Sequence, residues 1–317
     1  MKRFWRKVWP VMKDTFGDWS TDKCPRLGAA LSYYTVFSLA PVLILVIAVA
    51  GIFLGREAAQ GKIVEQLTGM LGLDAAKMVQ AAILKASARD AGIRASVIGI
   101  VTMLVGATGV MVELQDALNT VWKVLPKPGA SVKRFLRARL LALALVLSIG
   151  FLLLVSLVMS AGLEVFVSWA GGFLPKWVAI GYLLNYVVSV GVVALFFALL
   201  FKLLPDAKVA WKDVWIGALF TSFLFHLGKY LIALYIGRAS VASTFGAAGS
   251  LAVLLVWIYY SSQILLLGAE LTRAYANRYG SHVVPDENAI PAPHAAPERL
   301  AVEKKIKERG SPSPSRA

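Results

Sequence analysis

Six stretches of the chain are long and apolar enough to be read as membrane spans. Five contain no charged side chain and lie between Arg26 and Arg56, Arg94 and Glu113, Arg139 and Glu164, Lys176 and Lys202, and Arg238 and Glu270. A sixth, Val214 to Gly228, is shorter and continues through Lys229 to Gly237. A spanning helix needs about 20 mostly apolar residues to cross roughly 30 Å of hydrocarbon, where the backbone must satisfy its own hydrogen bonds. The pattern predicts an all-α, polytopic six-helix transmembrane bundle with amphipathic interfacial helices.

The composition supports one membrane domain rather than two soluble ones. Hydrophobic residues make up 58% of the 317 residues and charged residues 16%, whereas soluble domains carry about 25% charged residues. We expect a cytoplasmic interfacial segment over residues 1–26 and a six-span domain over residues 27–276. An external helical loop is expected at 56–94, with two amphipathic helices folded back on the membrane or the bundle. The Ser/Pro-rich tail, residues 277–317, is expected to be disordered.

Lysine and arginine are concentrated in alternate loops, which predicts the orientation. Seven precede the first span, six lie between residues 113 and 139, three between 202 and 213, and eight after residue 269, against nine in the other loops. Basic residues are retained on the cytoplasmic side, so both termini are predicted to be cytoplasmic. The net charge of +15 is then a topology signal and an attraction to anionic lipid, and not a nucleic-acid footprint.

The segment before the first span has an amphipathic pattern. Large apolar residues recur close to helical spacing between basic ones: Phe4, Trp5, Val8, Trp9 and Met12. This pattern is typical of a helix in the inner interface, with a solvated basic tail as the alternative because Pro10 interrupts it. The single cysteine, Cys24, is interpreted as an unremarkable thiol near that interface.

Polar residues at membrane depth are the candidate functional residues of the first two spans. Tyr34 and Ser38 precede Pro41 in the first span. Proline leaves the carbonyl of residue 37 without its donor, so we predict a functional kink that Pro41→Ala would remove, with activity falling while stability holds. Asp116 and Asn119 extend the second span with one polar face.

The fifth span carries His226 and Lys229 three residues apart, on one helical face. Lys229 lies about 24 Å from Asp213 at about 1.5 Å per residue, in the outer part of the hydrocarbon core. Two interpretations follow. The lysine snorkels to the interface, or it faces the bundle interior and binds an anionic headgroup or pairs with a carboxylate.

The sixth span opens with a run of small residues that includes Gly246 and Gly249. Such a run permits close helix packing or a half-unwound entry to the helix. Gln263 and Glu270 follow seven residues apart and share a face. They either hold helices together by hydrogen bonds, with an interfacial carboxylate, or serve a functional site.

The sequence contains no pattern typical of a catalytic or metal centre. The three histidines are His226, His282 and His294, and the last two lie beyond the final span. No arrangement of the H-E-x-x-H, C-x-x-C, P-loop or G-x-S-x-G type occurs. We therefore expect no enzyme, no catalytic residue, no metal and no cofactor.

Three blocks of sequence resemble a known family. They are Ala29 to Pro41 (AALSYYTVFSLAP), Asp116 to Asn119 followed by Val121-Trp122, and a third block made of Phe245–Ser250, Leu255–Tyr259 and Leu267–Leu271. In this order they are similar to the signatures of the YihY / virulence factor BrkB family of bacterial inner-membrane proteins. The resemblance implies a six-spanning protein of the bacterial inner membrane, and it brings the family's historical label, ribonuclease BN.

Three hypotheses of function are compatible with these residues. The first is a protein that binds or moves a lipid or other amphiphile in the cell envelope. The second is an envelope scaffold that transports nothing, and the third is a membrane-bound ribonuclease, for which the residues offer no support. Membrane lipids are the expected partners, with other envelope proteins as a further class and nucleic acid excluded.

Overall fold

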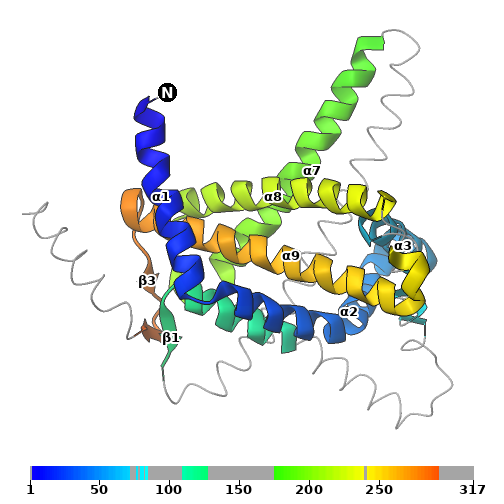
Figure 1. Ribbon diagram of the computed structural model, residues 1–317, viewed down its shortest axis with the longest axis horizontal. Helices are drawn as coiled ribbons and strands as arrows, with labels where there is room; N and C mark the ends of the chain where they lie inside the picture. Colours follow the sequence, from blue (N-terminus) through cyan, green and yellow to red (C-terminus); the bar gives the residue numbers. More distant parts are fainter. Residues whose placement is uncertain are drawn as a thin grey trace, which may run out of the picture.

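The computed structural model describes residues 2–71, 76–77, 79–81, 83–84, 109–127, 175–238 and 241–292. These ranges are mainly helical (Figure 1), with α1 (Lys2–Thr21), α2 (Cys24–Leu54), α3 (Arg56–Leu71), α7 (Pro175–Leu203), α8 (Trp211–Arg238) and α9 (Val241–Tyr279). A further helix covers residues 109–121. In the described part of the chain, three helices are long and apolar enough to cross a membrane, over Tyr186–Leu203, Trp211–Leu231 and Leu251–Tyr279.

These three helices coincide with the fourth, fifth and sixth predicted spans. The first predicted span falls in α2, a helix of 31 residues. The third predicted span and most of the second lie outside the described residues. The helical membrane fold is therefore confirmed, whereas the complete bundle of six stays a prediction.

Local sequence explains where the helices begin and end. Lys23 takes the left-handed conformation (φ 54°) between α1 and α2, and Pro25 follows in the first turn of α2, where its missing N–H costs no helical bond. Gly55 ends α2 with φ 81°, a backbone conformation that glycine adopts without strain. Pro175 opens α7 in the same manner as Pro25 opens α2.

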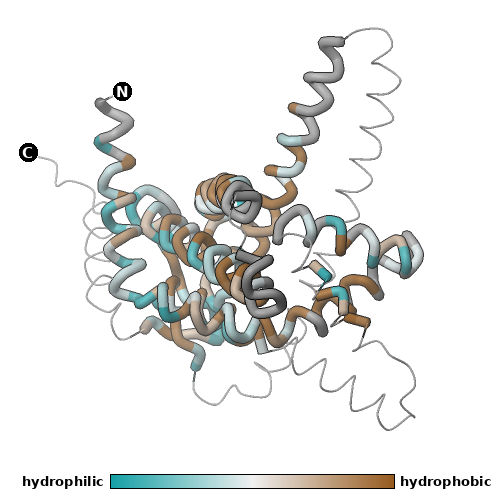
Figure 2. Tube along the Cα trace, turned by 45° about the vertical axis from the view of Figure 1, so that its right-hand side comes forward, coloured by the Kyte–Doolittle hydropathy of each residue, from teal (hydrophilic) through white to brown (hydrophobic). Residues whose placement is uncertain are grey.

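The bundle is built around α8 and α9. Helix α8 packs against both α7 and α9, and α9 packs against α2. The N-terminal part of α7 projects away from the other helices (Figure 1). Large apolar side chains remain on the outer faces, for example Phe223 and Val256, each 60% exposed. Figure 2 shows hydrophobic residues along the bundle helices and hydrophilic residues frequent around α1. Apolar outer faces of this kind suit a lipid surrounding.

Close contact between α8 and α9 depends on two reciprocal glycine–threonine pairs. A Cβ on Gly217 would lie 1.8 Å from Oγ1 of Thr272, and one on Gly268 would lie 1.7 Å from Oγ1 of Thr221. Each threonine hydroxyl donates to the carbonyl of the glycine four residues earlier in its own helix, at 2.7 Å for Thr221 and 2.8 Å for Thr272. Small residues at such a crossing let two membrane helices approach closely.

Helix α3, in the first part of the 56–94 segment, packs on the bundle. Its Ala59 and Ile63 are buried in one cluster with Val46 of α2 and Trp257 of α9. Val79 and Ile83, from the short helical pieces that follow, join the same cluster. The remainder of the loop lies outside the described residues, and the side of the membrane stays a prediction.

Helix α1 crosses the end of the bundle instead of running alongside its helices (Figure 1). Its buried residues Val11 and Thr15 face α9, where Leu271 and Ala274 pack against Val11. The predicted amphipathic helix is present, and Pro10 lies inside it without ending it. The most buried face of this helix packs on protein.

The segment after α9 forms strands where disorder was expected. Strand β4 (Ala289–Pro291) pairs with β1 (Val124–Pro126), and β3 (Val284–Pro285) pairs with β2 (Ala207–Lys208), both antiparallel. The predicted disordered tail from residue 277 is therefore wrong up to residue 292, because α9 continues to Tyr279 and the following residues find backbone partners in two interhelical loops. We call residues 280–292 the strap. Residues 293–317 lie outside the described part.

Candidate functional site

A network of buried charged side chains joins α1, α9 and the end of the 109–121 helix. Glu270 of α9 is fully buried, and its Oε2 accepts a hydrogen bond from Nε of Arg273 at 3.3 Å. Arg273 also forms an ion pair with Asp18 of α1. Asp22, at the end of α1, pairs with Lys123, which follows the 109–121 helix. A buried charge is tolerated only when paired in this way, so the network fixes three helix ends relative to one another.

Cys24 lies inside this network, so its interpretation as an unremarkable interfacial thiol is wrong. Its side chain is fully buried, and Sγ donates to Oε1 of Glu270 at 3.8 Å. Its carbonyl accepts from Nε2 of Gln263 at 3.2 Å. Burial, reinforced by the neighbouring Glu270 carboxyl, raises the pKa of the Cys24 thiol, so the thiol keeps its proton and acts as a donor. Gln263 and Glu270, whose seven-residue spacing places them on one face of α9, thus both contact Cys24 at the start of α2.

A second buried network forms where the 109–121 helix meets the loop after α7. Asn119 donates from Nδ2 to Oδ2 of Asp206 at 3.0 Å and accepts from the Asp206 backbone N–H at 2.8 Å. Gln115 donates to the same carboxylate oxygen at 3.3 Å. The backbone N–H of Asp286, in the strap, donates to the carbonyl of Asp206 at 2.9 Å. Asn119 therefore anchors the strap through Asp206, whereas Asp116, one turn earlier, is exposed.

The contact between α7 and α8 places polar side chains in the apolar part of the bundle. His226 directs Nδ1 at the carbonyl of Ser222 at 2.9 Å and Nε2 at Oγ of Ser189 on α7 at 3.4 Å. Since a carbonyl only accepts, Nδ1 donates to Ser222, and the Ser189 hydroxyl meets Nε2. The ring of Tyr186 meets His226 edge-on at 5.9 Å between centroids.

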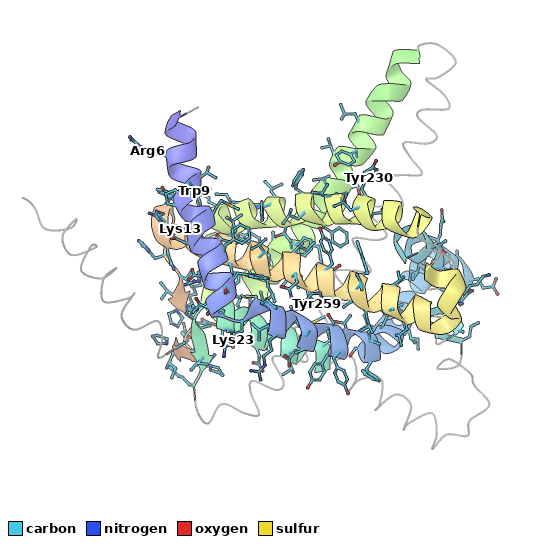
Figure 3. All side chains as sticks on the ribbon, in the orientation of Figure 1. Arg6, Trp9, Lys13, Lys23, Tyr230 and Tyr259 are labelled. Atoms are coloured by element: carbon cyan, nitrogen blue, oxygen red, sulfur yellow. The ribbon has the colours of Figure 1, made fainter. Side chains whose placement is uncertain are left out.

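Lys229 extends this polar region by one helical turn. It is half-buried, like His226, and both lie in the apolar segment Trp211–Leu231. Ser222 of α8 contacts Val190 of α7, and His226, one turn later, contacts Ser189 and Tyr186. Lys229, a further turn along α8, lies on the same helical face as His226. Tyr230, beside it in sequence, is 67% exposed on the outer side of α8 (Figure 3). We call Tyr186, Ser189, His226 and Lys229 the α7–α8 seam.

The remaining predicted site residues do not gather at one place. Tyr34 is exposed on α2 and would lie 3.5 Å from a Cβ built on Gly109, while Ser38 is buried. Pro41 lies within α2, which continues as a helix to Leu54. Gly246 and Gly249 are in α9, and Gly249 is buried. The functional kink at Pro41 stays a prediction.

Sequence reasoning missed the partners of these residues. Three of these partners lie near helix ends or in short loops, where charged residues are common: Asp22, Arg273 and Asp206. Their local sequence therefore does not indicate that they are buried. Within the described ranges, no three His, Cys, Asp or Glu side chains form a group that could hold a metal ion.

Long apolar helices with hydrophobic outer faces and polar groups gathered between helices define an integral membrane protein of the helical class. A sequence model of the family described as Virulence factor BrkB matches residues 15–292. The chain belongs to this family.

Curated relatives carry names of the same kind. A "UPF0761 membrane protein" of Verminephrobacter eiseniae is 29% identical over 86% of this chain and 63% of its own length. The "UPF0761 membrane protein Mpe_A1422" of Methylibium petroleiphilum is 27% identical over 91% of this chain and 70% of its own length. The "Putative ribonuclease-like protein YfkH" of Bacillus subtilis is 25% identical over 87% of this chain and 98% of its own length. The chain thus spans about two thirds of the first two relatives. No solved structure matches it.

Proposed function

We propose that this membrane protein handles a lipid or other amphiphile, and that the α7–α8 seam binds the anionic headgroup. The observation that carries the proposal is the half-buried position of His226 and Lys229 in an apolar helix that is long enough to cross a membrane. Ionisable residues in spans are costly and are usually functional. An amphiphile is the class of ligand that brings a polar head and apolar chains to one place.

The chemistry of the seam fits an anionic headgroup. Lys229 supplies a cation, whose attraction to an anion is stronger away from bulk water. Ser189, which contacts His226, supplies a hydroxyl whose proton can rotate toward a phosphate or carboxylate oxygen. Exposed tyrosines flank the pair, Tyr186 at 55% and Tyr230 at 67%, and offer apolar surface with a polar tip to the acyl chains and the headgroup.

Reconstitution tests the proposal. The purified full chain is placed in liposomes that contain a fluorescent anionic lipid, and an impermeant reductant reports how much of that lipid leaves the inner leaflet. Uptake of a labelled amphiphile is measured in parallel. We expect flux or uptake above protein-free liposomes, reduced by His226→Leu and unchanged by Tyr259→Leu, an exposed aromatic of α9 (Figure 3). Equal traces for protein-containing and protein-free liposomes would overturn transport.

A scaffold role is the rival outcome of the same work. Specific co-purification of other envelope proteins, with no flux and no bound lipid, would favour it. We propose further that the chain is not a nuclease, although the printed name of the Bacillus subtilis relative contains the word ribonuclease. The support is the lack of any metal-hydrolase motif in the sequence. RNA cleavage that co-elutes with the purified protein would overturn this.

We also propose six spans in a bacterial inner membrane, with both termini in the cytoplasm. The distribution of Lys and Arg supports this orientation. The contacts of α1 with the end of α9 and of the strap with two interhelical loops support a common side for the two ends of the membrane domain.

A further inference from the structure

The two faces of α1 differ sharply. One face is buried against α9 through Val11 and Thr15. The other face is exposed and carries a stripe at alternating spacings of three and four residues: Arg6, Trp9, Lys13, Phe16 and Ser20. Residues with this spacing share one side of a helix. Trp9 is 67% exposed and Phe16 52%, and Figure 3 shows Arg6, Trp9 and Lys13 in succession along α1. We call these five residues the outward stripe.

The charge of the outward stripe is positive because the acidic residues of α1 are engaged elsewhere. The helix contains two, Asp14 and Asp18. Asp14 pairs with Arg278 of α9 and Asp18 with Arg273. Arg6 and Lys13 are left as the charged groups of the stripe, with an exposed aromatic ring after each one. Cations with interleaved aromatic residues are typical of surfaces that bind anionic headgroups.

Helix α1 lies at the end of an apolar helix that is long enough to cross a membrane. The helix contacts α9 between Leu271 and Arg278, at the end of the apolar segment Leu251–Tyr279. It also crosses the bundle helices instead of following them (Figure 1). A helix placed across the end of a span lies in the zone where Trp and basic residues are favoured.

We propose that the outward stripe of α1 docks on the anionic surface of the bilayer. Arg6 and Lys13 contact the lipid phosphates, and Trp9 and Phe16 enter the boundary between headgroups and acyl chains. This contact is separate from the α7–α8 seam and holds whether or not the protein moves lipid. Because α1 is tied to α9 by Asp14 and Asp18, docking also supports the ion pairs at the end of α9.

The test uses the full chain in nanodiscs of neutral lipid or of neutral lipid mixed with phosphatidylglycerol. A polarity-sensitive fluorophore is attached to Gly17→Cys, an exposed position of α1 at which an added Cβ meets nothing within 4 Å. Ser20→Cys, also exposed, is the second labelling site. The unsubstituted protein, whose Cys24 is buried, controls for labelling at that residue. Quenching by a lipid with a spin label on its headgroup measures contact with the surface.

We expect quenching about twofold or more greater in the phosphatidylglycerol discs, with a blue-shifted emission that high salt reverses. Arg6→Gln with Lys13→Gln should return the signal to its value in neutral discs. Lys127→Gln with Lys208→Gln removes the same charge from the strap region, where these lysines contact Glu287 and Asp286, and should leave the signal unchanged. Equal quenching in both kinds of disc at both labelled sites, or an equal loss in the two double variants, would overturn the proposal.

Discussion

Glu270 and Arg273, one turn apart on α9, form an ion pair inside the protein, with 3.3 Å between Oε2 and Nε. Glu270 is fully buried and the arginine side chain is 3% exposed. Cys24 of α2 donates to Glu270, and Asp18 of α1 pairs with Arg273. The pair therefore links the end of the last described span to the start of the chain.

Removing one partner of this pair should destabilise the protein strongly. Glu270→Gln leaves Arg273 buried with Asp18 as its remaining carboxylate. Breaking a buried pair from one side costs about 3–5 kcal/mol in soluble proteins, so we expect a clear fall in the thermal unfolding temperature in detergent. Arg273→Met should lower the unfolding free energy less in the Glu270→Gln background than in the unsubstituted protein. In that background only the Asp18 carboxylate loses its partner.

Arg278→Gln is the matched control for that experiment. It breaks the exposed ion pair between Arg278 of α9 and Asp14 of α1, whose side chains are 41% and 45% exposed. We expect a change within about 1 kcal/mol. Equal unfolding temperatures for Glu270→Gln and the unsubstituted protein would show that the buried pair does not hold the helix ends.

The reciprocal glycine–threonine contact predicts an effect opposite to helix propensity. Alanine usually stabilises a helix relative to glycine by about 1 kcal/mol. Gly268→Ala should instead destabilise by about 1–3 kcal/mol, because α8 must move away from the new Cβ. Thr221→Ala should recover part of the loss, since it removes Oγ1 but leaves Cβ at 3.0 Å from that position.

Gly191→Ala on α7 is the control, because a Cβ there meets nothing within 4 Å. It should leave the unfolding temperature unchanged or raise it slightly. If both glycine variants unfold at the same temperature, α8 and α9 are not as close as described.

Asn119→Ala should loosen the strap. The substitution removes both hydrogen bonds to Asp206, and each buried group left without a partner costs about 1–3 kcal/mol. Since the Asp206 carbonyl also holds the strap through Asp286, limited trypsin digestion after Lys208 should become faster. Thr120→Ala removes an exposed hydroxyl that donates to the carbonyl of Asp116 in its own helix, and this variant should digest as the unsubstituted protein does. Digestion that is equally slow in both variants would contradict this role of Asn119.

Sequence periodicity was sufficient to predict features that depend on neighbours along one helix, such as the helices themselves and the residues that share a face. Charge-free runs located the described apolar helices, and the seven-residue spacing of Gln263 and Glu270 placed both on one face of α9. Periodicity could not supply partners distant in sequence: Cys24 and Glu270 are 246 residues apart, and Asn119 and Asp206 are 87 apart. The small-residue run at residues 244–250 of α9 favoured close packing or a half-unwound entry to the helix. The close contact of Gly268 with Thr221 of α8 lies outside that run and depends on tertiary structure.

The strap shows why composition led to a wrong prediction of disorder for residues 280–292. Proline-rich sequence after a last span is typical of disorder, and the strap contains Pro285 and Pro291. Proline is nevertheless tolerated in short edge strands. Val284 and Ile290 favour extended structure, so they were the local signal that could have indicated strands.

The orientation of the protein is tested by reporter fusions. Fusions after Arg94 and after Ala276 should report opposite sides of the membrane, because an odd number of spans is predicted between them and basic residues favour the cytoplasm near Ala276. A fusion placed before α1 should report the same side as the one after Ala276. Signals from one side for Arg94 and Ala276 would contradict the six-span model.

Photo-crosslinking to lipid tests the central claim, that the α7–α8 seam binds an anionic amphiphile. A photoreactive phenylalanine analogue replaces Tyr186, and the full chain is irradiated in membranes with anionic lipid and analysed by mass spectrometry. We predict an anionic-lipid adduct that Lys229→Arg partly retains and Lys229→Gln largely loses, since the charge is the contact. An adduct of equal yield in Lys229→Gln and the parent, at matched abundance, would return Lys229 to a snorkelling role and contradict the account.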